Sequence, residues 1–342
     1  MNGFLKKLVF LCVTLAFSAA GLYSAQAQEK EVTVGYQLIY NPWKVAIADK
    51  AFEKATGYKI NWKQFDSGAK VINAMASGDV QIAIAGSSPI AAGVSRGLPL
   101  EVFWILEDIA AAEALVVRDG SGIAAPQDLA GKKIGVPFVS TTHFHMLFAL
   151  EQFGIAPDDV TLLNMQPNSI AAAWERGDID AAFVWNPALG RIKDSGKVLL
   201  TSGLLSSWGK ATFDGLVVQK DWAAENNDFM VSFVKTLAEA DEAYRSNPGA
   251  WTAESEMVKK IVDLIGGNAE DVPEVLALYG FPTLQEQASS RWLGGGADGG
   301  AAKALRFTSE FLKEQGSIDT TLDDYGSVVN PKWVDEALAQ SK

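Results

Sequence analysis

Two stretches of the chain show the same succession of apolar and polar positions. In residues 69–85 and again in residues 169–185, a helix-like run leads into a continuous apolar segment. A Gly-Asp pair, beginning at Gly78 and at Gly177, stands between the two parts each time. Glycine accepts the positive φ at a helix C-terminus without a Cβ penalty. Each pair is therefore predicted to end a helix and turn the chain into a buried strand.

Each repeated stretch closes a longer β-α-β-α-β pattern. Apolar runs predict its strands, and amphipathic runs between them predict its helices. The predicted strands lie at 31–37, 59–65 and 80–85 in the first pattern and at 134–138, 160–165 and 179–185 in the second. The predicted fold class is α/β, with two lobes that each contain a doubly wound sheet and flanking helices.

The pattern also predicts individual boundaries. Asn41 and Pro42 are expected to begin a helix that ends at Gly57, with the asparagine as its N-cap. The amphipathic stretch at 221–246 is expected to form one continuous helix. Further strands are expected at 100–106, 113–117, 198–201 and 213–219, and further helices at 254–264, 283–293 and 301–315.

Length and the N-terminal sequence suggest the domain organisation. A chain of 342 residues exceeds one average domain. Lys6 and Lys7 precede a short apolar run, and residues 25–27 read Ala-Gln-Ala. This arrangement is typical of a secretory signal peptide cleaved near Ala27, and the run is short for a membrane anchor. The expected division is a signal peptide at 1–27, lobe 1 at 28–112 and 212–342, and lobe 2 at 113–211. Export to the periplasm follows from it.

Composition narrows the possible chemistry. Cys12 is the only cysteine and lies in the expected signal peptide, so the mature chain offers no thiol nucleophile or thiolate metal site. The net charge of −12 opposes binding to nucleic acid. His143 and His145 are the only histidines, and residues two apart do not share a helix face. We expect no metal, no cofactor, no catalytic residues and a soluble monomer.

Hydroxyl side chains lie where predicted strands give way to helices. Ser87 and Ser88 follow the first repeated strand, and Thr141 and Thr142 follow the strand at 134–138. A helix start offers unpaired N–H groups and a partial positive charge, which can hold an oxyanion. Helix capping is the alternative role. Two such starts at equivalent points of two lobes favour a shared anion site at the strand ends.

Two tryptophans are candidate walls of that site. Trp185 ends the second repeated strand, and Trp43 stands at the start of the first predicted helix. Small-molecule sites are usually lined by apolar and aromatic side chains with a few polar anchors. Ordinary packing is the alternative for each tryptophan.

Acidic residues lie near the expected crossings between lobes. Asp214 and Glu113 each open a predicted strand there, where a carboxylate can receive a ligand ammonium. Asp214 is the preferred candidate, and capping of a turn is its alternative role. Glu107 and Asp108 are interpreted as solvated loop charges.

Several segments together resemble the taurine-binding proteins of ABC importers. They lie at 66–69, 76–82, 86–89, 113–117, 136–143 and 173–180, and the resemblance extends from about residue 30 to 325. It implies the type II periplasmic binding-protein fold, no catalytic activity, and delivery of the ligand to a membrane permease driven by an ATPase. It also implies that Ser87, Ser88, Thr141 and Thr142 line the sulfonate end of the site and Asp214 the amine end.

Two segments depart from the pattern of these proteins. Residues 40–43 and 107–113 differ, both border the predicted cleft, and Trp43 is bulky enough to reshape it. The ligand can therefore be taurine, another small sulfonate, another oxyanion or a heterocycle. An enzyme on the same fold, such as a pyrimidine-forming enzyme of thiamine synthesis, is the alternative class. An enzyme would need a nucleophile, metal or cofactor residue set and would not need a secretory signal.

Overall fold

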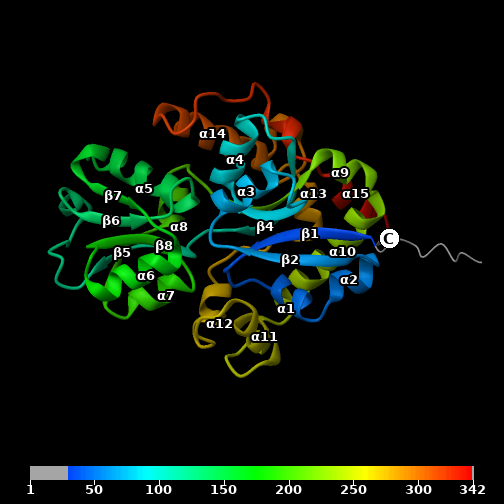
Figure 1. Ribbon diagram of the computed structural model, residues 1–342, viewed down its shortest axis with the longest axis horizontal. Coiled ribbons are helices and arrows are strands. Elements are labelled where there is room, and N and C mark those ends of the chain that lie inside the picture. Colours follow the sequence, from blue (N-terminus) through cyan, green and yellow to red (C-terminus); the bar gives the residue numbers. More distant parts are fainter. Residues whose placement is uncertain (1–29, 341–342) are drawn as a thin grey trace, which may run out of the picture. The chain divides into compact units, whose positions relative to one another are not determined.

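The computed structural model describes residues 30–340, and the expected signal peptide lies outside them. The described chain forms two five-stranded sheets, in the orders β2-β1-β3-β10-β4 and β7-β6-β8-β5-β9 (Figure 1). The first sheet contains β1 (Glu31–Gln37), β2 (Lys59–Phe65), β3 (Ile82–Gly86), β4 (Leu100–Asp108) and β10 (Phe213–Gln219). The second contains β5 (Glu113–Arg118), β6 (Lys133–Val136), β7 (Thr161–Asn164), β8 (Ala181–Trp185) and β9 (Gly196–Thr201).

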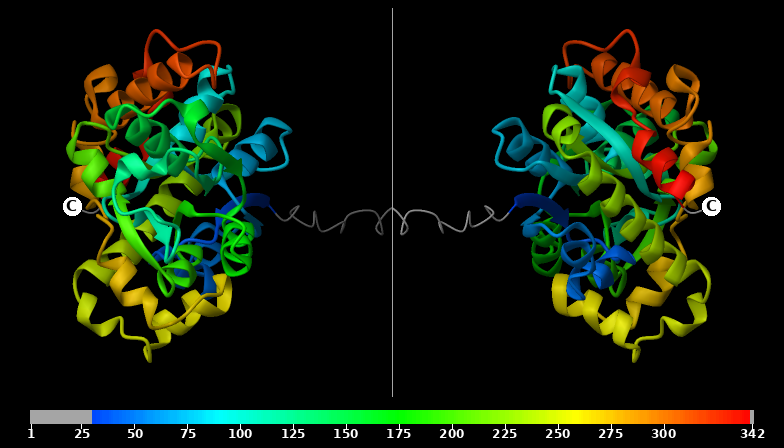
Figure 2. Two further views of the ribbon diagram at one scale, coloured as in Figure 1. Left: turned by 90° about the vertical axis from the view of Figure 1, so that its left-hand side faces the viewer. Right: turned by 90° about the vertical axis from the view of Figure 1, so that its right-hand side faces the viewer.

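The two sheets are built alike. In each, the three strands of one β-α-β-α-β pattern run parallel, with β1 between β2 and β3, and β6 between β7 and β8. One further strand pairs antiparallel with two neighbours, β10 with β3 and β4, and β5 with β8 and β9. Helices flank each sheet (Figures 1 and 2). The predicted α/β fold class, with two sheets and flanking helices, is confirmed.

The helices follow the predicted pattern in most places. Around the first sheet they are α1 (Trp43–Ala48), α2 (Ala51–Thr56), α3 (Gly68–Ala76), α4 (Ser87–Ser95), α9 (Lys220–Glu225) and α10 (Asn227–Arg245). Around the second they are α5 (Thr141–Gln152), α6 (Pro167–Arg176), α7 (Ala188–Lys193) and α8 (Ser202–Ser207). The later part of the chain adds α11 (Glu256–Ile265), α12 (Asp271–Leu276), α13 (Leu284–Ala288), α14 (Gly300–Glu314) and α15 (Lys332–Gln340). The sequence pattern did not predict α7, α8, α12 or α15.

The glycines of the two Gly-Asp pairs have the predicted conformation. Gly177 caps α6 with φ 75°, and Gly78 stands just beyond the end of α3 with φ 85°. A residue with a side chain is strained at such angles. Both turns lead into fully buried strands, β3 and β8.

The first predicted helix is interrupted, contrary to expectation. It divides into α1 and α2 because Lys50 adopts a left-handed φ of 52°. Asn41 does not cap it with its side chain. Its Nδ2 donates to Glu107 Oε1 at 3.3 Å, while its Oδ1, the atom that would accept in a cap, has no partner among the described residues.

The long helix predicted at 221–246 is also divided, at Asn226, into α9 and α10. The Asn226 side chain is held on both sides. Its Nδ2 donates to Trp222 O at 2.7 Å, and its Oδ1 accepts from the Tyr58 hydroxyl at 2.7 Å. Asparagine competes well for such local backbone bonds, which is why it disfavours helix interiors.

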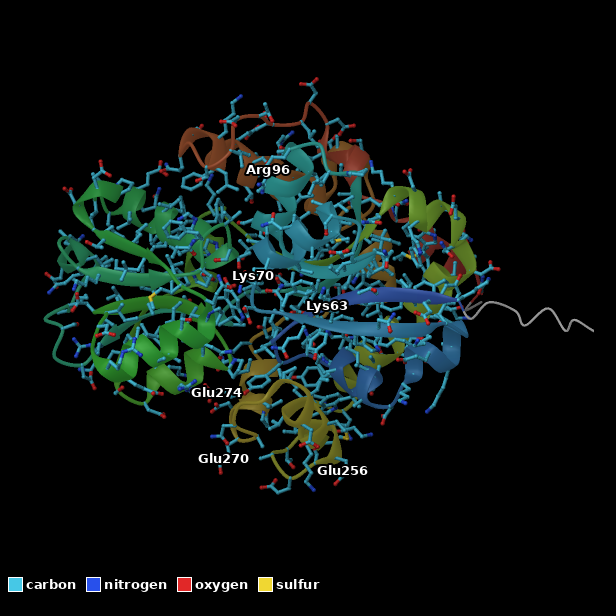
Figure 3. The ribbon with its side chains drawn as sticks, in the orientation of Figure 1. Lys63, Lys70, Arg96, Glu256, Glu270 and Glu274 are labelled. Carbon is cyan, nitrogen blue, oxygen red and sulfur yellow. The ribbon has the colours of Figure 1, made fainter. Side chains whose placement is uncertain are left out.

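The chain passes between the sheets twice, at 109–112 and at 202–212. The lobe boundaries at 112–113 and 211–212 stay a prediction. Lys63, Lys70 and Glu274, labelled in Figure 3, are exposed residues. Within residues 30–340, every helix is too short or too polar to cross a lipid bilayer.

Candidate ligand-binding site

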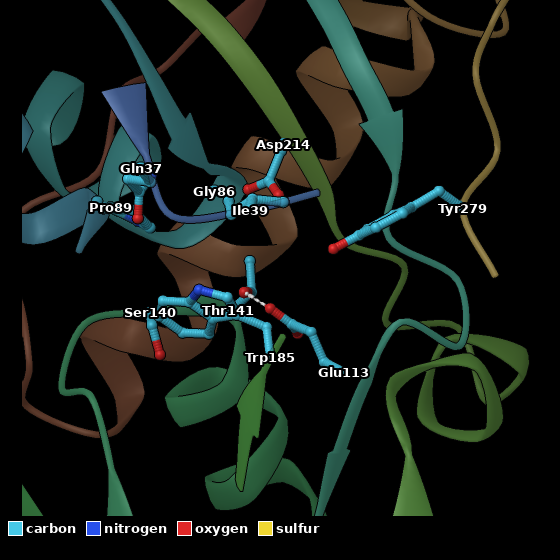
Figure 4. A pocket seen from close by; sticks show the side chains of 11 residues that line it. Gln37, Ile39, Gly86, Pro89, Glu113, Ser140, Thr141, Trp185, Asp214 and Tyr279 are labelled. Atoms are coloured by element: carbon cyan, nitrogen blue, oxygen red, sulfur yellow. Dashed lines mark hydrogen bonds between the residues drawn. The ribbon is translucent and has the colours of Figure 1, made fainter. Parts of the chain in front are cut away.

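A narrow cleft lies where strand ends from the two sheets meet (Figure 4). In this conformation it leaves only about 10 Å³ for a water-sized molecule, so a larger ligand requires the two sides of the cleft to move apart. The residues that line it are Gln37, Ile39, Gly68, Gly86, Pro89, Glu113, Ser140, Thr141, Trp185, Asp214 and Tyr279.

Two acids occupy corresponding positions in the cleft. Asp214 is the second residue of β10 and pairs with Gly86 at the end of β3. Glu113 opens β5 and pairs with Trp185 at the end of β8. Because β10 and β5 hold the same place in their sheets, the acids are topological equivalents, as the sequence predicted. Figure 4 shows both at the same opening, with the Tyr279 hydroxyl pointing toward them.

Glu113 is buried and hydrogen-bonded on both oxygens. Thr141 Oγ1 donates to its Oε1 at 2.5 Å, and Ser202 Oγ lies 3.0 Å from its Oε2. Burial raises the pKa of Glu113 to about 8. The hydrogen bond from Thr141 acts in the opposite direction and lowers this pKa, whereas the charge of Asp214 raises it. The neutral acid is therefore favoured at neutral pH without a ligand.

Asp214 is linked to a second buried acid. Burial raises the pKa of Asp214 to about 7, opposed by a hydrogen bond with Glu107 and by the charge of Lys44. The interpretation of Glu107 as a solvated loop charge is wrong, because β4 continues to Asp108 and Glu107 pairs with Asp214 across the sheet. Burial also holds the pKa of Glu107 well above its usual range, and the charge of Asp214 adds to this.

Asp108 is likewise part of the strand and not a free loop charge. Its backbone N–H donates to Gly280 O at 2.7 Å, and Gly280 N donates back to its carbonyl at 3.0 Å. This bridge holds the segment that carries Tyr279 against the end of β4. Burial is the main cause that raises the pKa of Tyr279 well above its usual range. The nearby charges of Glu107, Asp214 and Glu113 raise it further.

The sequence reasoning missed Lys44, which is fully buried beside these acids. Its ammonium lies 4.7 Å from the Trp43 ring centroid and 5.1 Å from that of Tyr36. Burial lowers the pKa of Lys44 to about 7, although the negative charges of Glu107 and Asp214 raise it in part. A single lysine in a short helix gives no signal of burial in the sequence.

Ser87 and Ser88 form the first turn of α4, and neither caps the helix. Both residues are fully buried, and neither hydroxyl has a hydrogen-bond partner among the described residues. Buried polar groups are rarely left unpaired in native proteins, and each one asks for an explanation. The capping alternative therefore does not account for these two serines, although neither lines the cleft directly.

The start of α5 is arranged differently. Ser140 caps the helix by accepting from His143 N at 3.1 Å, and its Oγ lies 2.7 Å from Thr142 Oγ1. Thr141 lines the cleft, whereas Thr142 is fully buried behind it.

The two helix starts are not equivalent, contrary to expectation. Helix α4 follows β3, whereas α5 follows β6, and the counterpart of β3 in the second sheet is β8. They nevertheless meet at the cleft. A Cβ on Gly86, just before α4, would lie 2.8 Å from Thr141 Cγ2.

The two tryptophan candidates have different positions. Trp185 lines the cleft with 6% of its surface exposed. The expectation for Trp43 is not met, because it lies in the core against Phe52 and Trp62, at centroid distances of 6.2 and 5.7 Å. Trp43 therefore packs beside Lys44 in the core and does not form a wall of the cleft.

Gln37 and Tyr279 are further lining residues that the sequence reasoning missed. Gln37 ends β1, and its Nε2 donates to Ile84 O at 3.1 Å. A polar residue at the end of a predicted parallel strand was a usable signal. Tyr279 follows α12 in a segment without periodicity, so nothing in the pattern pointed to it.

Sequence comparison places the chain among known proteins. Residues 45–251 match the family model described as NMT1/THI5 like. The chain belongs to the NMT1/THI5-like family. Within it, the chain is 41% identical to the taurine-binding periplasmic protein of Escherichia coli K12, over 93% of this chain and 97% of that relative.

Solved structures show how widely this NMT1/THI5-like fold is used. The periplasmic aliphatic sulphonate binding protein SsuA from Escherichia coli superposes with a TM-score of 0.70 at 20% identity, covering 89% of this chain and 99% of its own. The desulfurization enzyme DSZB gives a TM-score of 0.62 at 16% identity, covering 92% and 100%. Binding proteins and an enzyme share the fold, so the site must decide between them.

Proposed function

We propose that this protein is an extracytoplasmic solute-binding protein that captures taurine or a related small sulfonate and delivers it to an ABC permease. The observation that carries the proposal is a small cleft at which two helix starts and two buried acids meet. Such a cleft complements an anion and a cation on one short molecule. The 41% identity to a taurine-binding periplasmic protein supports the same ligand class.

The anionic end of the ligand belongs at the helix starts. Backbone N–H groups at the beginnings of α4 and α5 can donate to sulfonate oxygens, and the helix dipoles favour negative charge there. The unpaired hydroxyls of Ser87 and Ser88 are available as donors if the first turn of α4 adjusts around the ligand. Closure of the two lobes around the ligand is part of the proposal.

The cationic end belongs between Asp214 and Glu113. An ammonium carries three donors, which matches two carboxyl groups and the hydroxyl of Tyr279 in the same opening (Figure 4). Trp185 supplies an apolar wall beside them.

A binding role suits the cleft better than an enzymatic one. The cleft-lining residues include carboxyls, an amide and hydroxyls, but no histidine, lysine or cysteine that would serve as or activate a nucleophile. No cofactor is required for the proposed role. We place the protein in the periplasm as a monomer, after cleavage near Ala27, with an inner-membrane permease and its ATPase as partners.

The direct test is a thermal-shift series on the purified mature protein. Taurine or an alkanesulfonate at 100 times its Kd should stabilise the fold by about 2.7 kcal/mol. Sulfate, nitrate, amino acids and thiamine precursors form the comparison set. Stabilisation by a heterocycle or an inorganic oxyanion alone would contradict the proposal.

Ser88→Ala should weaken sulfonate binding without loss of stability in the ligand-free protein. The Ser88 hydroxyl is buried without a partner among the described residues, so its removal relieves a desolvated polar group. A hydrogen bond to a charged ligand contributes about 1.5–3 kcal/mol, or roughly 10- to 150-fold in Kd. Calorimetric titration and thermal denaturation measure the two effects.

Ser95→Ala is the matched control on the same helix. The Ser95 hydroxyl lies 2.7 Å from the Tyr325 hydroxyl and 3.2 Å from that of Ser309. Its loss should lower stability and leave the affinity unchanged. An unchanged affinity in Ser88→Ala would place the anion elsewhere.

A further inference from the structure

A line of hydrogen bonds runs from the cleft into the segment that crosses between the sheets. Glu113 Oε2 lies 3.0 Å from Ser202 Oγ, and Ser202 Oγ lies 2.8 Å from His145 Nδ1. His145 Nε2 lies 2.7 Å from the carbonyl oxygen of Lys210, within the crossing at 202–212. We call Glu113, Ser202 and His145 the relay.

The protons of the relay follow from its geometry. The Lys210 carbonyl can only accept, so His145 Nε2 carries a proton. Ser202 has one hydroxyl proton for two neighbours, so one of those neighbours must donate to it. If Glu113 were a carboxylate and His145 Nδ1 carried no proton, both would be acceptors. The single Ser202 hydroxyl proton could then satisfy only one of the two contacts, and the other would have no proton. The relay is therefore complete only when Glu113 or His145 Nδ1 carries one further proton.

Two arrangements satisfy every bond. In the neutral one, the protonated Glu113 donates to Ser202, and Ser202 donates to His145 Nδ1. In the ionic one, an imidazolium Nδ1–H donates to Ser202, and Ser202 donates to the Glu113 carboxylate. The two differ only in the positions of the same protons.

The ligand-free protein favours the neutral arrangement. Burial raises the pKa of Glu113 to about 8 and lowers that of His145 to about 4. Glu113 faces Asp214 and Tyr279 at the cleft, and the negative charge of Asp214 favours the neutral acid. His145 is fully buried and packs against the rings of Phe144 and Phe183.

We propose that the ammonium group of a bound ligand moves the relay proton from Glu113 to His145, so that Glu113 becomes the carboxylate that receives the ammonium. The inference rests on the proposed function, since it requires a ligand with a cationic end. The proton on Glu113 passes to Ser202 Oγ as the hydroxyl proton of Ser202 passes to His145 Nδ1. No bond other than these O–H and N–H bonds changes, and no proton reaches solvent.

The relay makes His145 a positioning residue for zwitterionic ligands. The ammonium stabilises the carboxylate, and the carboxylate in turn stabilises the imidazolium through Ser202. A sulfonate without an amine supplies no such charge and leaves the relay neutral. Because the imidazolium donates more strongly than imidazole to Lys210 O, occupancy of the cleft also strengthens a bond to the crossing segment.

Nitrogen NMR of histidine-labelled full-length mature protein tests the relay directly. The chain has two histidines, so two rings are observed, and the variant His143→Gln assigns them. The expected result is neutral His145 without ligand and with ethanesulfonate, but imidazolium with taurine. His143 is the internal control, because Val139 N donates to its Nδ1 at 3.3 Å and keeps that nitrogen unprotonated.

Calorimetry of a relay variant gives a second readout. Ser202→Ala should lower the affinity for taurine by about tenfold, the scale of one charge-assisted hydrogen bond, and leave ethanesulfonate unaffected. Titrations in buffers of different ionisation enthalpy should show more proton release per taurine in the variant than in the wild type, because only the wild type can pass the Glu113 proton to His145. Ser207→Ala, on the same helix, is the control, because its Oγ donates only to Leu204 O.

The outcomes are separable. Taurine that binds while His145 stays neutral, or the same imidazolium signal with ethanesulfonate, overturns the relay and leaves the proposed function intact. Binding of ethanesulfonate but not of taurine overturns the relay alone, and binding of neither overturns both.

Discussion

Asp214→Asn is expected to weaken taurine binding by roughly tenfold or more, because a charge-assisted hydrogen bond contributes about 1.5–3 kcal/mol. Asparagine keeps nearly the same volume at the start of β10 but cannot carry a charge. An alkanesulfonate without an amine should bind as well as before or better, since a buried negative charge near the ligand is lost. Titration calorimetry at pH 8 measures both, because the pKa of Asp214 is raised to about 7.

Asp241→Asn provides a matched control. Asp241 is another fully buried acid on α10, and burial holds its pKa well above the usual range, but it does not line the cleft. Its replacement should leave the ratio of the two affinities unchanged. Equal losses for taurine and the alkanesulfonate in Asp214→Asn would indicate a structural role. No loss for either would remove Asp214 from the site.

The sequence predicted those parts of the site that depend on local patterns. Strand periodicity and the two Gly-Asp turns located the ends of β3 and β8, where Gly86 and Trp185 meet the cleft. The same periodicity placed Glu113 and Asp214 at the beginnings of their strands. These conclusions needed only side-chain alternation and turn chemistry, which are readable along the chain.

What the sequence could not predict is set by tertiary pairing. Glu107 was interpreted as solvated because it follows the strand predicted at 100–106, where the chain was expected to cross between the lobes. The structure continues β4 and places Glu107 opposite Asp214. Lys44 similarly stands in a short helix, yet packs over two aromatic rings. Burial of a charged group depends on partners distant in sequence, and no local pattern encodes them.

Gly86→Ala should weaken taurine and ethanesulfonate together, unlike the selective loss expected at Asp214. Gly86 has φ −66° and ψ 158°, which any residue can adopt, so the backbone accepts alanine. The new Cβ would lie 2.8 Å from Thr141 Cγ2 and 3.3 Å from Asp214 Oδ1. It would therefore push apart the two sides of the cleft.

The size of the effect follows from how firmly Thr141 is held. Thr141 begins α5, and its hydroxyl donates to the buried Glu113 at 2.5 Å. It cannot swing aside without breaking that bond, so the start of α5 must move. Overpacking of this kind costs about 1–3 kcal/mol, which corresponds to roughly 5- to 150-fold in Kd if the cost falls on the closed, ligand-bound state.

Gly93→Ala separates this effect from general crowding. A Cβ at Gly93 would also meet its nearest atom at 2.8 Å, but that atom is Ile72 Cγ2, on α3 beside the same sheet. The Gly93 variant should change the free energy of unfolding and leave both affinities intact. Calorimetric titration of both ligands into both variants measures the affinities. Denaturation of the ligand-free proteins measures the free energy of unfolding. Wild-type affinity in Gly86→Ala would show that the ligand does not require the end of β3 and the start of α5 to approach as they do here.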